Sequence, residues 1–358
     1  MTTREIPAYT PGRVDSVTLS TNELAGGPLA VAVDAVRRAA DDVHRYPDTS
    51  AAVLVEAIAR HHGLSPDCVV VGAGAAEVLH RLGRIAAPDP ADLVMFGWPG
   101  FEAYPVLLSA AGNGQQRIPL TGRHRLDLEA MLAAVTAATR VVVLCNPNNP
   151  TGTIVAEHDL RRFVDNLPSR VLVVLDEAYF GFDDGPDVVD GVEFAQQCWA
   201  AGQANVVAVR SFSKAYGLAG LRVGYAVASP DVCVRLCRAA VPFGVSRPAQ
   251  EAAAAVLGDP RETVLRCRRI SSDRAHLANV LGAAGYPVAD SRANFLWLPL
   301  GDQSASFVEH CRAYGVAVLG YPEGVRVSIG TLEDNAVFAR VADAYTPQLR
   351  PIRREHRE

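Results

Sequence analysis

The most reactive group that the sequence offers is the amine of Lys214, which lies among Ser, Phe, Ala and Gly residues in the segment 211–217. A single lysine is usually a solvated surface cation, but these neighbours are small or apolar. Such surroundings take water away from an amine, lower its pKa and make it a nucleophile. Arg222 follows eight positions later in the same glycine-containing stretch. The segment therefore predicts a desolvated, nucleophilic lysine at residue 214.

Three other segments place polar or small residues directly after short apolar runs. Asp176 follows the run 171–175, where a carboxylate either points into a site or caps the next element. The segment 146–152 holds two prolines and several asparagines, which by themselves predict a turn. The segment 72–77 leads small residues into a helix, so that its N–H groups suit an anion, although a tight turn explains it equally well. Taken singly, each segment can be explained either by a functional site or by local structure alone.

The elements that must position these residues alternate through the middle of the chain. Continuous apolar runs are typical of strands covered on both faces, and strand–helix alternation predicts an α/β domain with a mostly parallel sheet. The predicted strands cover residues 68–71, 93–96, 140–145, 171–175 and 206–209, and the helices between them include 127–137 and 157–166. Functional loops gather at the carboxyl ends of such strands.

The pattern changes after about residue 245. A long helix over 262–284 precedes short strands near 294–297 and 325–328, and more helix runs toward Tyr345. The charged residues 350–358 are expected to form a solvated tail. We expect three parts, namely an N-terminal arm with part of the small domain at 1–35, a large domain at 36–245 and a small α+β domain at 246–358.

Composition narrows the class of protein. The 358-residue chain is 49% hydrophobic and 20% charged, with a formal net charge of −5. Mild acidity gives no electrostatic reason to expect nucleic acid or an anionic membrane as a partner. The start lacks the apolar segment of a signal peptide, and no apolar run is long enough to span a bilayer. Seven cysteines without a CxxC pair fit a reducing cytoplasm and predict no metal site.

Together, the order of these segments resembles the fold type I, aspartate-aminotransferase-like enzymes that use pyridoxal 5′-phosphate (PLP). Within that group the chain is most similar to the histidinol-phosphate and aromatic aminotransferase family, over nearly its whole length. The resemblance rests on Asn149, Asp176, Tyr179, Lys214 and Arg222, with further matches at 19–23, 45–48, 96–98, 101–105 and 324–328. It implies a mostly parallel central sheet flanked by helices, and ping-pong transamination between an amino acid and a 2-oxo acid.

The resemblance also implies a role for each residue around PLP. Lys214 holds the cofactor as a Schiff base and moves the Cα proton, while Asp176 keeps the pyridine nitrogen protonated so that the ring accepts electrons. Tyr179 and Asn149 hydrogen-bond the phenolic oxygen, and Phe101 stacks on the ring. Hydroxyl, charged and backbone donors bind the phosphate, namely Ser211, Ser213, Arg222 and the amides of Ala75 and Ala76.

Further roles are implied for the substrate side and for a second subunit. Arg326 binds the α-carboxylate of the substrate, Asn149 also contacts the substrate, and Tyr9 of the N-terminal arm closes over it. Tyr46 reaches the phosphate of the neighbouring subunit, so the resemblance implies a homodimer with closed two-fold symmetry.

The chain departs from the family on the substrate side. Histidinol-phosphate aminotransferases usually carry a second arginine shortly before the Gly-x-Arg segment, and the best-matching residue here is Leu319. We expect a buried leucine at that position, which cannot bind a phosphate dianion. The usual Asn-Glu-Asn-Pro opening is altered at 24–25, and Gly244 stands where asparagine is frequent. We therefore expect a substrate with an aromatic or other apolar side chain, in a pocket lined by Leu319, Phe243 and Tyr321.

Three alternatives stay open. The first is a histidinol-phosphate aminotransferase of histidine biosynthesis, in which Arg13 or Arg247 holds the phosphate. The second is a PLP-dependent decarboxylase or lyase on the same fold, which aligns a different Cα bond with the ring. The third is a PLP-binding regulator, which we do not favour because such proteins usually carry an added DNA-binding domain that 358 residues leave no room for.

Overall fold

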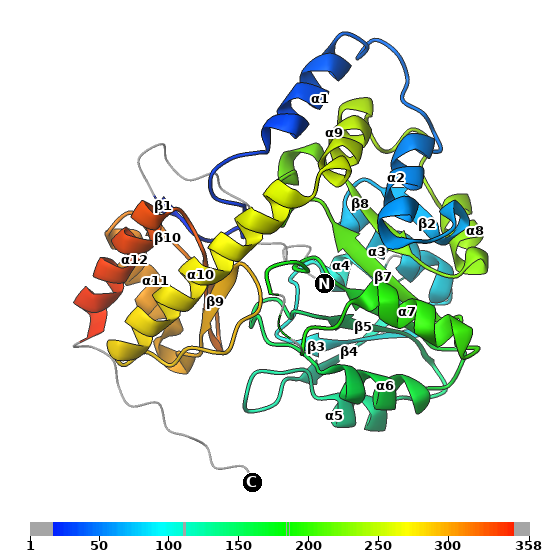
Figure 1. The fold of residues 1–358 in the computed structure, drawn as a ribbon. Helices are drawn as coiled ribbons and strands as arrows, with labels where there is room; N and C mark the ends of the chain where they lie inside the picture. The colour runs from blue at the N-terminus through cyan, green and yellow to red at the C-terminus, as the bar shows by residue number, and fades with distance from the viewer. Residues whose placement is uncertain (1–16, 110–111, 184, 186, 347–358) are drawn as a thin grey trace.

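The computed structural model describes residues 17–109, 112–183, 185 and 187–346 (Figure 1). Tyr9, Arg13 and the charged segment 350–358 lie outside the described residues. A larger body is built on a seven-stranded sheet, and a smaller body beside it holds a three-stranded sheet. The long helix α10 (Arg261–Ala283) leads from the first body into the second.

The central sheet has the strand order β2-β8-β7-β6-β5-β3-β4. All neighbouring strands pair in parallel except β8, which runs antiparallel to both β2 and β7. The prediction of a mostly parallel sheet is therefore confirmed. Its strands are β2 (Val69–Gly72), β3 (Leu93–Trp98), β4 (Gly114–Pro119), β5 (Thr139–Cys145), β6 (Leu172–Asp176), β7 (Val206–Ser211) and β8 (Gly224–Val227).

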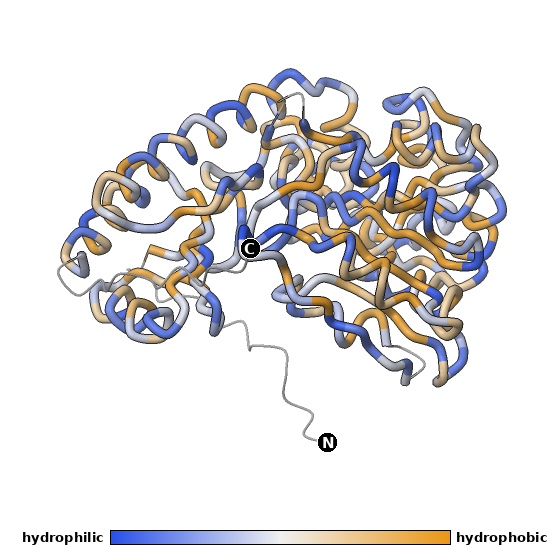
Figure 2. The backbone as a smooth tube through the Cα atoms, turned by 90° about the horizontal axis from the view of Figure 1, so that it is seen from below, coloured by the Kyte–Doolittle hydropathy of each residue, from blue (hydrophilic) through white to orange (hydrophobic). Residues whose placement is uncertain are grey.

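Helices cover both faces of this sheet, which explains the continuous apolar runs. Along β5, Val141 and Val143 join the core under one face, and Val142 and Leu144 join the core under the other. In Figure 2, stretches of hydrophobic residues run through the middle of the larger body. The covering helices are α3 (Ala75–Ala86), α4 (Tyr104–Leu107) and α8 (Pro230–Arg238) on the first side and α2 (Ala52–His62), α5 (Leu128–Ala133), α6 (Glu157–Asp165), α7 (Gly191–Ala200) and α9 (Arg247–Gly258) on the second.

Helix α5 is shorter than the predicted helix over 127–137, because it ends at Ala133. The hydroxyl of Thr139 accepts the N–H of Thr136 at 2.9 Å, and the hydroxyl of Thr136 accepts the N–H of Ala138 at 3.2 Å. These side chains bind the backbone locally in place of a further helical turn.

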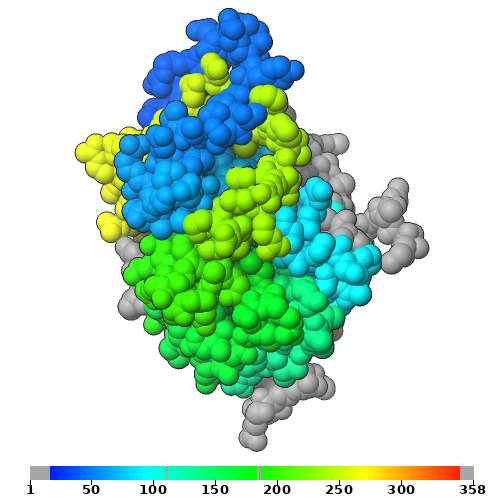
Figure 3. Space-filling view, turned by 90° about the vertical axis from the view of Figure 1, so that its right-hand side faces the viewer, coloured from blue at the N-terminus to red at the C-terminus, as the bar shows by residue number. Residues whose placement is uncertain are grey.

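The smaller body contains the sheet β11-β12-β9. Beside it, the described beginning of the chain, β1 (Val17–Thr18), pairs in parallel with β10 (Val316–Ala317). Helix α1 (Ala30–Ala40) packs instead against α9 at the top of the larger body, as the space-filling view shows (Figure 3). The elements of the smaller body are β9 (Phe295–Leu298), β11 (Leu319–Tyr321), β12 (Gly324–Ser328), α11 (Ser304–Ala313) and α12 (Leu332–Tyr345). The division of the chain at 35/36 and 245/246 stays a prediction.

Candidate active site

Polar residues meet at one edge of the central sheet, where the parallel strands end. Asp176 is the last residue of β6 and pairs in register with Cys145, the last residue of β5. The next residue, Asn146, donates its N–H to the carbonyl oxygen of Asp176 at 3.0 Å. The turn that holds Asn149 therefore begins beside the main chain of Asp176.

The connection between β7 and β8 brings its residues to the same edge. Ser211 ends β7 and pairs with Gly224, the first residue of the antiparallel strand β8. Gly224 also pairs with Gly72, the last residue of β2. Because the chain leaves and re-enters the sheet at this edge, both Lys214 and Arg222 lie on a loop above it.

The carboxylate of Asp176 is buried, with 3% of the residue exposed. The hydroxyl of Tyr104 donates to Asp176 Oδ2 at 2.6 Å, and the N–H of Ala178 donates to Oδ1 at 3.1 Å. Burial raises the pKa of Asp176, and the hydrogen bond from Tyr104 opposes this rise. Tyr104 is a site residue whose contact with Asp176 the sequence did not reveal; its one signal was its place in the matching segment 101–105.

The amine of Lys214 donates to the carbonyl oxygens of Thr21 at 3.1 Å and Asn22 at 3.0 Å. Burial lowers the pKa of Lys214 to about 7, and the nearby positive charge of Arg326 acts in the same direction. A substantial fraction of the amine is therefore neutral near pH 7, as a nucleophile requires. Lys214 is also the only lysine among the 34 Lys and Arg residues of the chain, a signal that the sequence analysis missed.

Arg222 and the amino end of α3 form a concave group of donors. Arg222 Nη1 donates to Ser213 Oγ at 3.3 Å, and Ser211 Oγ accepts the N–H of Ser213 at 3.0 Å. Gly74 precedes Ala75 at the start of α3 with a φ of +87°, and a Cβ added there would meet Arg222 Nη2 at 2.5 Å. The guanidinium group thus lies against bare backbone at a helix amino end, which fits a phosphate.

The residues predicted around the cofactor ring lie next to these groups. The buried hydroxyl of Tyr179 accepts a hydrogen bond from Asn22 Nδ2 at 3.0 Å. Phe101 packs edge-on against Tyr104, with 5.4 Å between ring centroids, and Tyr104 in turn binds Asp176. The donor and acceptor set at this edge therefore fits a phosphorylated pyridine.

Arg326 on β12 is 4% exposed and enters the same region from the smaller body. Its Nη2 donates to the carbonyl oxygen of Ser20 at 2.7 Å, and its Nη1 donates to Asn149 Oδ1. Among the described residues its buried Nε has no hydrogen-bond partner. The carboxylate of Glu102 lies 3.6 Å from Nη1 and also accepts the hydroxyl of Tyr321. An arginine with a spare buried donor fits a carboxylate ligand, and Glu102 is a neighbour that sequence reasoning missed.

A family profile described as aminotransferase class I and II matches residues 14–341. The chain belongs to this family. The aromatic amino acid aminotransferase of Nocardia farcinica is 44% identical over 345 residues, with 94% of each chain covered. That of Streptomyces coelicolor is 41% identical over 351 residues, with 96% of each chain covered.

A solved structure of similar fold is the histidinol-phosphate aminotransferase of Sinorhizobium meliloti in complex with pyridoxal-5′-phosphate. It superimposes with a TM-score of 0.85 at 27% identity, covering 93% of this chain and 91% of that chain. The expected aminotransferase and the expected fold type I architecture are both confirmed.

In this aminotransferase, Leu319 lies directly opposite Arg326 in the antiparallel pair of β11 and β12, and Trp297 lies opposite Arg326 on the other side. Opposed residues of paired strands share a face of the sheet. The expectation of a buried leucine is wrong, because Leu319 is half-buried. It lies on β11, an edge strand of its sheet in which no residue is fully buried.

Two aromatic residues of the aminotransferase lie on its surface instead of at the sheet edge. Tyr46 is 80% exposed, and its ring packs on Phe243 with 4.8 Å between centroids. Phe243 was expected to line the pocket with Leu319 and Tyr321. The structure places it beside Tyr46, on the loop between α8 and α9 and with a φ of +60°.

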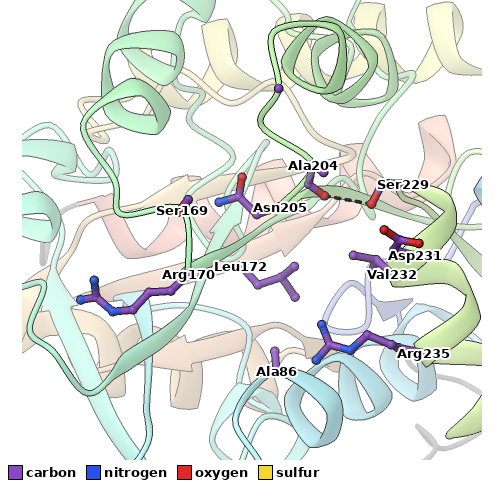
Figure 4. Close-up of a pocket in the computed structure, with 11 residues that line it drawn as sticks. Ala86, Ser169, Arg170, Leu172, Ala204, Asn205, Ser229, Asp231, Val232 and Arg235 are labelled. Atoms are coloured by element: carbon purple, nitrogen blue, oxygen red, sulfur yellow. Dashed lines mark hydrogen bonds between the residues drawn. The ribbon is translucent and has the colours of Figure 1, made fainter.

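A separate cavity of about 420 Å³ lies at the opposite end of the central strands (Figure 4). Leu172 and Asn205 border it where β6 and β7 begin, whereas the residues of the candidate active site lie where these strands end. Its two arginines are bound to main-chain oxygens, Arg170 to Thr136 at 2.8 Å and Arg235 to Ile85. This cavity takes no part in the site of the aminotransferase.

Proposed function

We propose that this aminotransferase uses PLP to move an amino group between an amino acid with an aromatic or other apolar side chain and a 2-oxo acid. The observation that carries the substrate class is the pairing of Arg326 with Leu319 across β11 and β12. One guanidinium group binds the α-carboxylate, and the residue opposite offers apolar surface in place of a second cation. The names of the relatives from Nocardia farcinica and Streptomyces coelicolor support the same class.

The cofactor would be held as the resemblance implies. PLP supplies a ring that takes up electrons when a bond at the substrate Cα breaks. Lys214 would bind it covalently, Asp176 would hold its ring nitrogen, and Tyr179 with Asn149 would hold its phenolic oxygen. Phe101 would lie against the ring, and the phosphate would bind to Ser211, Ser213, Arg222 and the amides of Ala75 and Ala76.

The chain's own residues then divide the work. Arg326 orients the substrate by its carboxylate, and burial of the site keeps water away from the reacting atoms. The amine of Lys214, with a pKa of about 7, would take up and release the proton of the substrate Cα, since a group that titrates near neutrality serves as both base and acid. Tyr9, whose arm lies outside the described residues, is proposed to close over the substrate.

A homodimer completes the proposal. The exposed pair of Tyr46 and Phe243 presents aromatic surface that a second copy of the chain would bury, with Tyr46 reaching the phosphate of that copy. We place the protein in the cytoplasm because all seven cysteines are free thiols. In the part of the chain that is described, no helix combines the length and apolar character needed to cross a bilayer.

A competition between two amino donors tests the substrate class. We expect phenylalanine to show a higher kcat/KM than histidinol phosphate with 2-oxoglutarate as acceptor. Each missing charged hydrogen bond to the phosphate costs about 1.5–3 kcal/mol, or roughly ten- to a hundred-fold in recognition. In the structure, Arg247 is paired with another group, since its Nη1 donates to Asp42 Oδ2 at 2.7 Å.

The matched variant is Leu319→Arg, which restores a cation opposite Arg326. It should raise kcat/KM for histidinol phosphate about ten-fold or more and leave phenylalanine less affected. A wild-type enzyme that prefers histidinol phosphate by about ten-fold would instead support the histidine-biosynthesis alternative, with the phosphate held by another residue such as Arg13.

A further inference from the structure

Asn22 stands where the smaller body meets the cofactor edge. It is 1% exposed and adopts a φ of 54°, a left-handed conformation that asparagine tolerates better than most residues. Its main-chain oxygen accepts the amine of Lys214 at 3.0 Å and Asn294 Nδ2 at 3.1 Å. Its side chain makes its hydrogen bonds with Ser328 and Tyr179.

Three hydrogen bonds run in series through this side chain. The main-chain N–H of Asn22 donates to Ser328 Oγ at 2.8 Å. The hydroxyl of Ser328 donates to Asn22 Oδ1 at 2.9 Å. Asn22 Nδ2 then donates to Tyr179 Oη at 3.0 Å.

The first donor favours one direction for the series. A backbone N–H can only donate, so Ser328 Oγ accepts from it, and the proton of Ser328 is used in this series only when the amide presents Oδ1 to it, as it does in the structure. With Oδ1 used as an acceptor, the end of the amide that faces Tyr179 is nitrogen, which also can only donate. The hydroxyl oxygen of Tyr179 is therefore an acceptor toward Asn22, and its own proton points to another partner.

We propose that Asn22 and Ser328 are positioning residues that aim the hydroxyl proton of Tyr179 at the phenolic oxygen of PLP. The inference rests on the proposed cofactor and on the place of Tyr179 beside it, and not on the substrate class. If the amide were reversed, Tyr179 would donate to Asn22 and have no proton for the cofactor. Since Ser328 lies two residues beyond Arg326 on β12, the series also ties the substrate-binding strand to the cofactor.

The consequence is measurable without turnover. The proton of the lysine–PLP Schiff base is shared with the phenolic oxygen, so a donor to that oxygen stabilises the form that has lost the proton. Tyr179 should thus lower the pH at which the absorbance of the PLP-loaded protein changes. Loss of the aimed proton should raise that midpoint.

The experiment is a pH titration of the absorbance of PLP-loaded protein, with Asn22→Gly as the main variant. Glycine accepts a positive φ without strain, so this change deletes the side chain and keeps the backbone. We expect the midpoint to rise, but by less than in Tyr179→Phe, because the hydroxyl loses its orienting partner while its proton is still present. In the Tyr179→Phe background, Asn22→Gly should add nothing, because the group through which it acts is absent.

Two further variants keep the test decisive. Ser328→Ala removes the other end of the series and should raise the midpoint by a smaller amount, which gives a second measurement if Asn22→Gly fails to fold. Asn294→Ala is the matched control, because Asn294 is a buried asparagine that touches only the main-chain oxygen of Asn22 in this series, and its midpoint should stay at the wild-type value.

Two results would overturn the inference. One is an unchanged midpoint in both Asn22→Gly and Ser328→Ala. The other is an equal rise for Asn22→Gly in the presence and absence of the Tyr179 hydroxyl, which would show action through a different group. A wild-type protein with no PLP absorbance would overturn the proposed cofactor as well, whereas a wrong substrate class would leave this inference standing.

Discussion

The cofactor edge and the carboxylate-binding region around Arg326 are built in different ways. At the cofactor edge, Asp176 and Ser211 end neighbouring strands of one sheet, and Lys214 follows on the next connection. Arg326 instead meets Ser20, which lies 306 positions away in the sequence, on a segment outside that sheet. The first region is fixed by the order of strands, and the second by how two bodies meet. Apart from the hydrogen bonds of Asn22, which join the two regions, changes in one should leave much of the other intact.

Replacing Lys214 by alanine should abolish turnover and the covalent attachment of PLP. The chain has no other lysine that could substitute for it. Absorbance of the PLP-loaded protein and mass spectrometry after borohydride reduction measure the attachment, and circular dichroism checks that the fold persists. A reduced adduct on the N-terminal amine, with turnover preserved, would refute the assignment.

Replacing Asp176 by alanine should lower kcat by about a hundred-fold or more, since a buried, charge-assisted hydrogen bond to the ring nitrogen is lost. Tyr104→Phe is the graded companion, because it removes one donor to Asp176 and keeps the carboxylate. Its effect on kcat should be clearly smaller. Near-normal turnover in Asp176→Ala would mean that another group holds the ring nitrogen.

Replacing Arg326 by leucine separates the two regions most directly. The KM for an amino acid should rise roughly ten- to a hundred-fold, from the loss of charged hydrogen bonds to its carboxylate. The affinity for PLP should change little. Arg222→Leu should show the reverse pattern, with weaker PLP binding. If both variants lose PLP equally, the two regions are not separable.

The pH dependence of PLP uptake should report the environment of Lys214. The neutral amine is the reactive form, and its pKa is lowered to about 7 by burial. In cofactor-free protein the uptake rate should therefore rise with pH below about pH 7 and level off above it. Arg326→Leu should move this midpoint upward by a modest amount, because the positive charge of Arg326 helps to lower the pKa. A rate that stays flat across this range would contradict the shift.

The sequence predicted the central sheet because β5 and β6 are buried on both faces and read as continuous apolar runs. Asp176 was found because it follows such a run, and Lys214 was found because its neighbours in the sequence are small or apolar. The strand β4 was missed because it lies at the sheet edge and none of its residues is fully buried. The strand β8 was missed because it reads Gly-Tyr-Ala-Val, with only one β-branched residue.

The contacts between distant segments had no local signal. Asn22 and Tyr179 are separated by 157 positions, and Tyr321 and Glu102 by 219. Hydrogen bonds of this kind depend on how the smaller body docks on the larger one, which periodicity along the chain does not encode. The position of Leu319 opposite Arg326 likewise follows from strand pairing, although its residue type had already suggested the substrate class.

The single lysine has a practical consequence. Apart from the chain's N-terminal amine, every amine-directed reagent has one target, so labelling stoichiometry becomes a direct count of sites not shielded by PLP. Every other residue in the Lys and Arg count is an arginine. The guanidinium group of arginine does not react as an amine and stays charged at any ordinary pH. An amine-directed reagent therefore leaves the arginine ion pairs charged, and substrate or cofactor protection would be read from the modification of one residue.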